Sequence, residues 1–323
     1  MIHASRLLLC IFLGLAALLA TPVSELYFEG MQAYDGQDYK KSIKIFKKIL
    51  KKYPTATDLG RVQAQIGMAY EALKKYKKAV DAYDIIFKKY MEYEHPEEIL
   101  EREFKIAEKY AKGEMKSVLG IDFAASNKTA VDIFDRVVKN APFGPHAEEA
   151  MLCAIRILQD DRKYDDMEAK VKLFKKTYEG SKLLDEVIYL DAYSYYLQSK
   201  RVDYDQTKTR QAIEKFEAYV EKFPQGQFYE KASAYSHELK DKETGQDFKT
   251  AEFYVTQKDF PAAKKYLENI RQKFPNTEWA DRAAKRLAEL EHLPEVGSPA
   301  EAVASPAGAV INPAGAGDGK EKI

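Results

Sequence analysis

The chain has 323 residues, with 51 basic and 51 acidic side chains, so its formal net charge is zero. A chain of this length is expected to form two domains or one elongated repeat array rather than a single small core. Because there is no basic excess, the composition does not support a nucleic-acid partner, and none is expected.

Residues 1–23 are predicted to be an export signal. Arg6 precedes an apolar run from Leu7 to Ala20, which is shorter than the roughly 20 residues that span a bilayer. An uncleaved signal anchor is the alternative interpretation. In either case we expect the folded part of the chain to lie outside the cytoplasm.

One residue pattern recurs through the middle of the chain. A small residue is followed four positions later by an aromatic or large apolar residue, three positions later by another such residue, and five positions later by proline. Small residues let two helices approach, the apolar residues share one helical face, and proline ends the helix. The four complete copies are Ser42-Phe46-Ile49-Pro54, Ala130-Phe134-Val137-Pro142, Ala212-Phe216-Tyr219-Pro224 and Ala263-Leu267-Ile270-Pro275.

The length of the repeat is clearest near its start. Gly67 and Tyr83 follow Gly30 and Phe46, in each case 37 residues later. A further copy lacks the proline and consists of Met167, Val171 and Phe174. A repeat of this length, with two helices per unit, is typical of tetratricopeptide (TPR) proteins. We therefore predict an all-α, TPR-like solenoid of about six helical hairpins.

The rest of the chain consists of inserts and a tail. The spacing predicts an inserted loop or extra helix around residues 112–127, and a shorter insert around residues 200–209. From residue 293 onward the sequence is rich in Pro, Ala, Gly and Ser and has no apolar periodicity, which is typical of a disordered tail. The predicted organisation is therefore a signal at 1–23, a superhelical domain at 24–292 and a tail at 293–323.

Residues that could support catalysis or metal binding do not form a recognisable motif. The five histidines are scattered, and neither a phosphate-binding glycine loop nor a nucleophile elbow occurs. Cys153 lies in an apolar run and is predicted to be a small buried side chain. We predict no enzyme activity, no cofactor and no metal. A glycan-processing enzyme, which would need paired carboxylates across a cleft, is the least favoured alternative.

The first helix of each hairpin is expected to line a concave face that binds protein partners. Tyr and Met side chains suit an apolar group of an extended peptide, and Arg suits a carboxylate. Packing of the first helix against the chain's own N-terminal segment is an equally weighted alternative for Tyr27 and Met31. The candidate residues in the first two hairpins are Tyr27, Met31, Tyr34, Arg61, Met68 and Glu71.

Two stretches carry the repeat pattern with second helices that end in Tyr-Pro or Phe-Pro. The first runs from Asp38 to Tyr53-Pro54, and the second from Ala251 through Phe260-Pro261 to Phe274-Pro275. In an exported chain this pattern resembles the BamD-like outer-membrane protein assembly factors, over roughly residues 24–291. The resemblance implies a periplasmic scaffold that helps to assemble and insert β-barrel proteins. Its implied partners are the outer-membrane barrel assembly machinery and unfolded barrel clients.

The resemblance also bears on location and on the alternative function. BamD-like proteins typically carry a lipidated cysteine at the end of the signal, whereas Cys10 follows Leu9 and precedes most of the apolar run. We therefore expect the chain to lie at the inner face of the outer membrane through a partner. The same TPR pattern occurs in YbgF-like proteins, which coordinate envelope constriction and wall synthesis. A YbgF-like adaptor is the alternative function.

Overall fold

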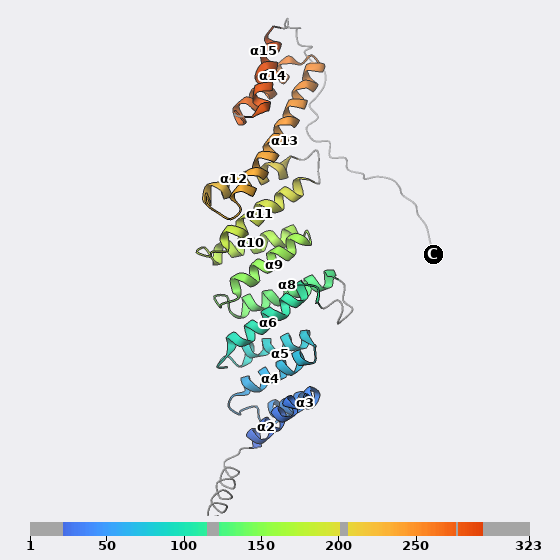
Figure 1. Ribbon diagram of the computed structural model, residues 1–323, viewed down its shortest axis with the longest axis vertical. Coiled ribbons are helices and arrows are strands. Elements are labelled where there is room, and N and C mark those ends of the chain that lie inside the picture. Colours follow the sequence, from blue (N-terminus) through green and yellow to red (C-terminus); the bar gives the residue numbers. More distant parts are fainter. Residues whose placement is uncertain (1–21, 115–122, 201–205, 276, 293–323) are drawn as a thin grey trace, which may run out of the picture. The chain divides into compact units, whose positions relative to one another are not determined.

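The computed structural model describes residues 22–114, 123–200, 206–275 and 277–292, and the regular structure in these ranges is α-helical (Figure 1). The predicted all-α, TPR-like architecture is confirmed. The predicted tail, Cys10 and nearly all of the predicted signal lie outside the described residues. None of the described helices is both long and apolar enough to cross a bilayer. The chain divides into two compact units, one ending at His237 and the other starting at Glu238.

The first unit consists of helical hairpins in chain order. Within each hairpin the two helices pack together, and each second helix then packs against the first helix of the next hairpin (Figure 1). The hairpins are α2 (Pro22–Asp35) with α3 (Tyr39–Lys52), α4 (Leu59–Ala72) with α5 (Tyr76–Lys89), α6 (Pro96–Ala111) with α8 (Phe123–Asn140), α9 (Ala147–Asp160) with α10 (Tyr164–Thr177), and α11 (Leu184–Ser199) with α12 (Thr207–Lys222).

The repeat pattern marks the core of each hairpin. Phe46, Phe134 and Phe216 occupy the same place in successive copies, and each is fully buried. The helices also end where the pattern predicts, since α3 stops at Lys52, two residues before Pro54. The spacing of four, three and five residues therefore sets both the buried face and the end of the second helix.

Tight turns join the two helices of a hairpin in the same way at several places. Gln37, Lys74 and Arg162 each adopt a left-handed backbone conformation, with φ of 61°, 57° and 59°. The N–H of the residue after each one bonds back to a carbonyl of the preceding helix, at 2.8 Å in all three turns. This arrangement satisfies carbonyl groups that the helix end would otherwise leave unpaired.

Each predicted insert falls between the two helices of a single hairpin. The first lies between the end of α6 at Ala111 and the start of α8 at Phe123, and the second between Ser199 and Thr207. Residues 115–122 and 201–205, at the centre of the inserts, lie outside the described part of the chain. The start of α8 is anchored, because Ser126 Oγ donates to the Tyr110 carbonyl at 2.6 Å.

The second unit has a small core of its own. The division between the units falls within α13 (Tyr229–Thr256), which is followed by α14 (Phe260–Lys273) and α15 (Glu278–Glu291). The guanidinium of Arg286 on α15 makes two hydrogen bonds to the carboxylate of Glu252, at 2.7 and 3.1 Å. The buried apolar residues that hold these helices together are Ala251, Ala263, Leu267, Ile270, Ala283, Leu287 and Leu290.

Candidate protein-binding face

The six residues proposed from the sequence lie on α2 and α4, the first helices of two successive hairpins. Arg61 is exposed, and the other five are partly buried. We call this set, Tyr27, Met31, Tyr34, Arg61, Met68 and Glu71, the N-terminal face. The structure joins some of these residues directly and separates others, so the face is a series of contacts rather than one continuous groove.

Tyr27 and Arg61 form the first contact. The guanidinium carbon of Arg61 lies 5.3 Å from the centre of the Tyr27 ring, within the range of a cation–π interaction. The Tyr27 ring also lies 5.6 Å, centre to centre, from the ring of Phe46. Partial burial raises the pKa of Tyr27, although the charge of Arg61 opposes this effect. Tyr27 is therefore a neutral phenol held between the hairpin core and an exposed cation.

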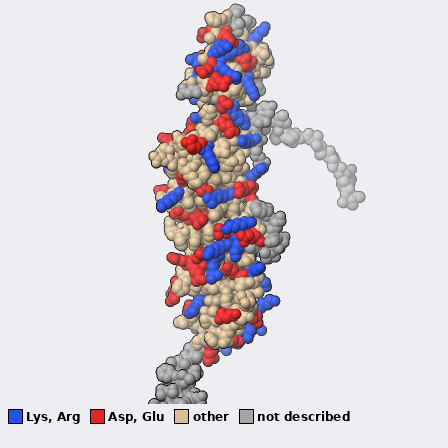
Figure 2. All heavy atoms as spheres, viewed as in Figure 1, with Lys and Arg blue, Asp and Glu red and all other residues tan. Residues whose placement is uncertain are grey.

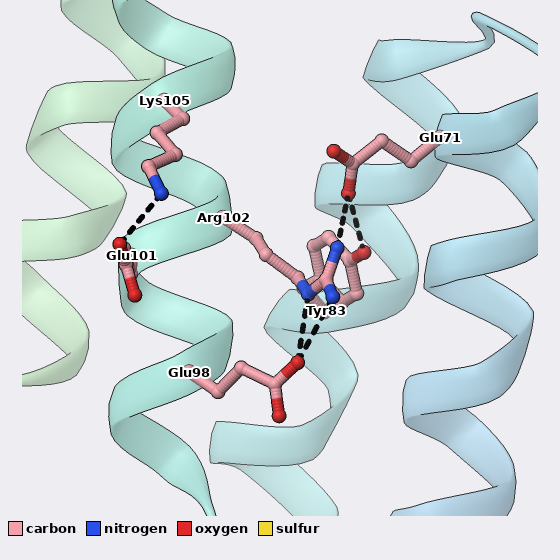
Figure 3. A network of polar contacts seen from close by, with 6 residues as sticks. All are labelled: Glu71, Tyr83, Glu98, Glu101, Arg102 and Lys105. Atoms are coloured by element: carbon pink, nitrogen blue, oxygen red, sulfur yellow. Dashed lines mark hydrogen bonds and ion pairs between the residues drawn. The ribbon is translucent and has the colours of Figure 1, made fainter.

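A network of polar side chains surrounds Glu71 (Figure 3). The Tyr83 hydroxyl donates to Glu71 Oε2 at 2.9 Å, and Nη1 of Arg102 lies 3.4 Å from the same oxygen. Arg102 Nη2 also donates to Glu98 Oε1, at 2.9 Å. These groups come from α4, α5 and α6, so the network ties three consecutive helices together. Glu71 is consequently already paired and is not an open acceptor.

Tyr34 belongs to the edge of the same network. Burial raises the pKa of Tyr34, and the neighbouring charges of Arg102 and Glu71 act on it in opposite directions. Its ring also packs edge-on against Tyr39, at 5.2 Å between centres. The structure therefore brings Tyr34, Glu71 and Arg102 together, although Arg102 was not among the residues proposed from the sequence.

The two methionines of the N-terminal face pack in different places. Met31 lies against the core shared by the first two hairpins, and Met68 against a core that the second, third and fourth hairpins share. The alternative in which Tyr27 and Met31 contact the chain's own N-terminal segment concerns residues outside the described part. What the structure shows for Tyr27 is packing against Phe46 on α3.

The described residues offer little for catalysis. Cys153 is partly buried, and burial raises the pKa of its thiol to about 11, which disfavours the reactive thiolate. Asp161, which follows Asp160 directly in the sequence, accepts a hydrogen bond from the side-chain amide of Asn127 at 2.7 Å. In the ranges that the structure covers, no group of three or more His, Cys, Asp or Glu side chains could hold a metal ion.

Charges of both signs are mixed over the face of the molecule drawn in Figure 2. Figure 2 shows Lys and Arg side chains interspersed with Asp and Glu on the face drawn. Some of them connect neighbouring hairpins, such as Arg136 with Asp81 at 2.9 Å and Arg156 with Glu186 at 2.7 Å. Exposed ion pairs of this kind contribute little stability, at about 0–1 kcal/mol each. Because the two signs alternate, the face shown in Figure 2 has no large area of a single charge.

Stacked hairpins with this core pattern define the class of tetratricopeptide-repeat proteins, and a sequence model of that repeat matches residues 26–56 and 65–90. The model of the YfiO family, described as outer membrane lipoprotein, matches residues 122–293, which is more than half of the chain. The chain therefore belongs to the YfiO family and is a BamD-like TPR protein. Its N-terminal face lies in the part that matches the general repeat model.

Individual relatives are distant. The outer membrane protein assembly factor BamD of Vibrio cholerae serotype O1 is 23% identical over 168 residues, which cover 48% of this chain and 68% of the relative. Among solved structures, a thermophilic TPR protein of Thermus thermophilus is 12% identical, with a TM-score of 0.31 over 66% of this chain and 98% of the other. The type IV pilus biogenesis factor PilW is 14% identical, with a TM-score of 0.28 over 82% and 100%. TM-scores this low support no functional argument.

Proposed function

We propose that this chain is a non-enzymatic scaffold that helps to assemble β-barrel proteins and insert them into the outer membrane. The observation that carries this proposal is the YfiO-family match over residues 122–293, together with the distant similarity to BamD. TPR and BamD-like proteins are generally scaffolds that act by binding other proteins. The chain would accordingly bind partner proteins and hold them in position, and it would not catalyse a reaction.

In this proposal, two kinds of partner would bind to different parts of the chain. We assign client recognition to the N-terminal face, where Arg61 lies beside the ring of Tyr27 and is mostly exposed, with Asp58 as a loose ion-pair partner at 3.9 Å. An extended client segment would place an apolar side chain on the ring and a carboxylate on Arg61. The hairpins matched by the family model would bind the barrel-forming assembly partner.

The proposed location follows from the same function. We place the chain in the periplasm, at the inner face of the outer membrane, after export by the segment at residues 1–23. Membrane association would come through the assembly partner rather than through a lipid on Cys10. Intact-mass measurement of the protein isolated from envelopes tests this directly, because a lipid anchor adds a large and characteristic mass.

Depletion of the protein in its native cells tests the function. We expect folded, heat-modifiable β-barrel proteins to decrease in the outer-membrane fraction, while inner-membrane proteins stay at their normal level. Re-expression of the full chain should restore the barrel proteins. Unchanged barrel levels after complete depletion would exclude the proposed function.

Crosslinking in intact envelopes, followed by purification and mass spectrometry, separates this proposal from the alternative. Recovery of a large barrel protein with periplasmic domains is the expected result. Recovery of wall synthases or Tol-type proteins without that barrel would favour the envelope-coordination adaptor. In that case the similarity to BamD would reflect the shared repeat rather than a shared partner.

A further inference from the structure

The aromatic pattern of the N-terminal face recurs on the first helix of a later hairpin. On α2 the pattern places three side chains at spacings of four and three residues around a small residue, Gly30. On α11 the same spacings surround Ala192, which is fully buried. The corresponding side chains are Tyr27, Met31 and Tyr34 on α2, and Tyr189, Tyr193 and Tyr196 on α11. A second aromatic surface therefore occurs inside the region that matches the YfiO family.

The tyrosines of α11 are held in a fixed array of rings. Tyr189 stacks on Phe228, with ring centres 4.3 Å apart, and Tyr196 lies 4.4 Å from Tyr235. Tyr193 lies 5.6 Å from Tyr196 and is only partly buried, so part of its ring faces solvent. Because its neighbours are packed, Tyr193 presents a pre-positioned aromatic surface and loses little freedom on binding.

An open pocket of about 410 Å³ lies beside Tyr193. It is formed where α9 ends, α10 begins and α11 ends. Tyr164, Tyr193 and Leu197 supply its apolar wall. The side-chain amide of Gln159 donates a hydrogen bond to the backbone carbonyl of Leu190 at 3.1 Å, and this bond connects α9 to α11 next to the pocket. The volume suits one large side chain together with its flanking backbone.

The rim of the pocket carries more positive than negative charge. Arg162 and Lys200 contribute two cations, and Asp160 contributes one carboxylate. Lys163, rather than Arg162, pairs with the neighbouring Asp161, at 3.6 Å. Arg162 thus has no carboxylate partner among the described residues, and the left-handed turn places it at the exposed rim. A carboxylate from another molecule would complete this arrangement.

We propose that this pocket, the α11 tyrosine pocket, binds an extended acidic segment of a partner protein. An aromatic side chain of the segment would lie against Tyr193 and Leu197, and a neighbouring Asp or Glu would reach Arg162. The inference rests on contacts around α11 and does not require the assembly role proposed above. It adds a second recognition surface to that of the N-terminal face.

Binding of a defined peptide to the purified full-length protein tests the proposal. The probe is a fluorescent, capped peptide in which one Phe is flanked by two Asp residues, and its binding is followed by fluorescence anisotropy. We expect Arg162→Glu to weaken binding about tenfold, since it replaces an ion pair by repulsion. Tyr193→Ala should weaken it by a similar factor, while Tyr193→Phe should retain it. Exchanging both Asp residues of the peptide for Asn should mimic Arg162→Glu.

The control variants locate the site. Arg271→Glu makes the same charge reversal at an exposed position in the second unit and should leave the affinity unchanged. Circular dichroism checks that each variant remains folded. Equal binding of the Asp and Asn peptides would overturn the proposal. So would a loss caused by Arg61→Glu but not by Arg162→Glu, or photo-crosslinking of position 193 to the chain's own residues 293–323.

Discussion

A β-carbon added to Gly67 would lie 2.1 Å from Cε1 of Tyr83, so the ring of Tyr83 occupies the space that a side chain at residue 67 would need. Gly30 and Phe46 stand in the same relationship one repeat earlier, at 2.6 Å. The glycine of the first helix therefore forms a socket, meaning that its lack of a side chain leaves room for the aromatic ring of the second helix. This contact also fixes Tyr83, whose hydroxyl reaches Glu71 in the network of the N-terminal face.

Gly67→Ala should destabilise the first unit by about 2 kcal/mol. In an open helix the same change would stabilise by up to about 1 kcal/mol, but here the methyl group must displace a fully buried ring. Urea unfolding followed by circular dichroism measures the difference. Gly180→Ala is the matched control, because nothing lies within 4 Å of its β-carbon position. A Gly67→Ala protein as stable as the wild type would contradict the proposed socket.

Removing a single hydroxyl should destabilise the protein at one buried tyrosine but not at another. Tyr83→Phe removes the 2.9 Å hydrogen bond to Glu71 and should destabilise by about 1 kcal/mol. The hydroxyl of Tyr110 is also buried but has no hydrogen-bond partner among the described residues. Tyr110→Phe should therefore be neutral or slightly stabilising. Parallel thermal melts compare the two variants, and an equal loss in both would show that the Glu71 contact contributes nothing.

Glu103 on α6 should make stability fall as the pH rises. Its side chain is buried and neither oxygen has a hydrogen-bond partner in the described part of the chain. Burial, reinforced by the charge of Asp84, raises its pKa to about 8. Because the folded-state pKa exceeds the unfolded value, the protonated form is favoured on folding. Its contribution is complete below the unfolded pKa of about 4.3 and is lost as the pH rises through the folded pKa.

Glu103→Gln should therefore be more stable than the wild type at pH 8.5, by on the order of 3 kcal/mol, and close to it at pH 5. Chemical unfolding of both proteins at the two pH values measures this difference. Glu97→Gln, at an exposed position of the same helix, should follow the wild type at both. A Glu103→Gln advantage that is independent of pH would show that ionisation of Glu103 is not responsible.

Arg61→Glu should weaken client capture by about tenfold, because it removes the exposed cation beside Tyr27 and adds repulsion toward a carboxylate. Photo-crosslinking from a probe at residue 31, in cells that express the variant, measures the yield of captured clients. Lys48→Glu reverses an exposed charge on α3 and should leave the yield unchanged. Equal yields from the wild type and Arg61→Glu would remove Arg61 from the recognition surface.

The sequence was informative wherever a contact lies within one hairpin. The recurring spacing identified Phe46, Phe134 and Phe216 as core residues, because residues three and four apart share a helical face. Proline then marked the ends of the second helices. The same local reasoning placed the six candidate residues on first helices, although their role in binding remains a prediction.

Contacts between hairpins required the tertiary structure. Arg102 follows Glu71 by 31 residues in the chain and contacts it from another helix. Tyr27 and Arg61 likewise belong to two adjacent hairpins and contact each other. The pairing depends on how far each hairpin rotates against the next, which residue spacing does not encode. The full burial of the Glu103 carboxyl, with no hydrogen bond to either oxygen among the described residues, also goes against sequence-based expectation, because charged residues are rarely fully buried.

By itself, then, the sequence determined the helical hairpins and the residues at their repeated core positions, since these follow from local periodicity and helix-ending signals. The tertiary structure alone decided which side chains of different hairpins meet. It joined Tyr83, Glu71 and Arg102 into one network, and it placed Arg162 and the partly buried ring of Tyr193 in the lining of one pocket. Those meetings depend on small rotations between packed helices, and the surfaces proposed for partners are built from them.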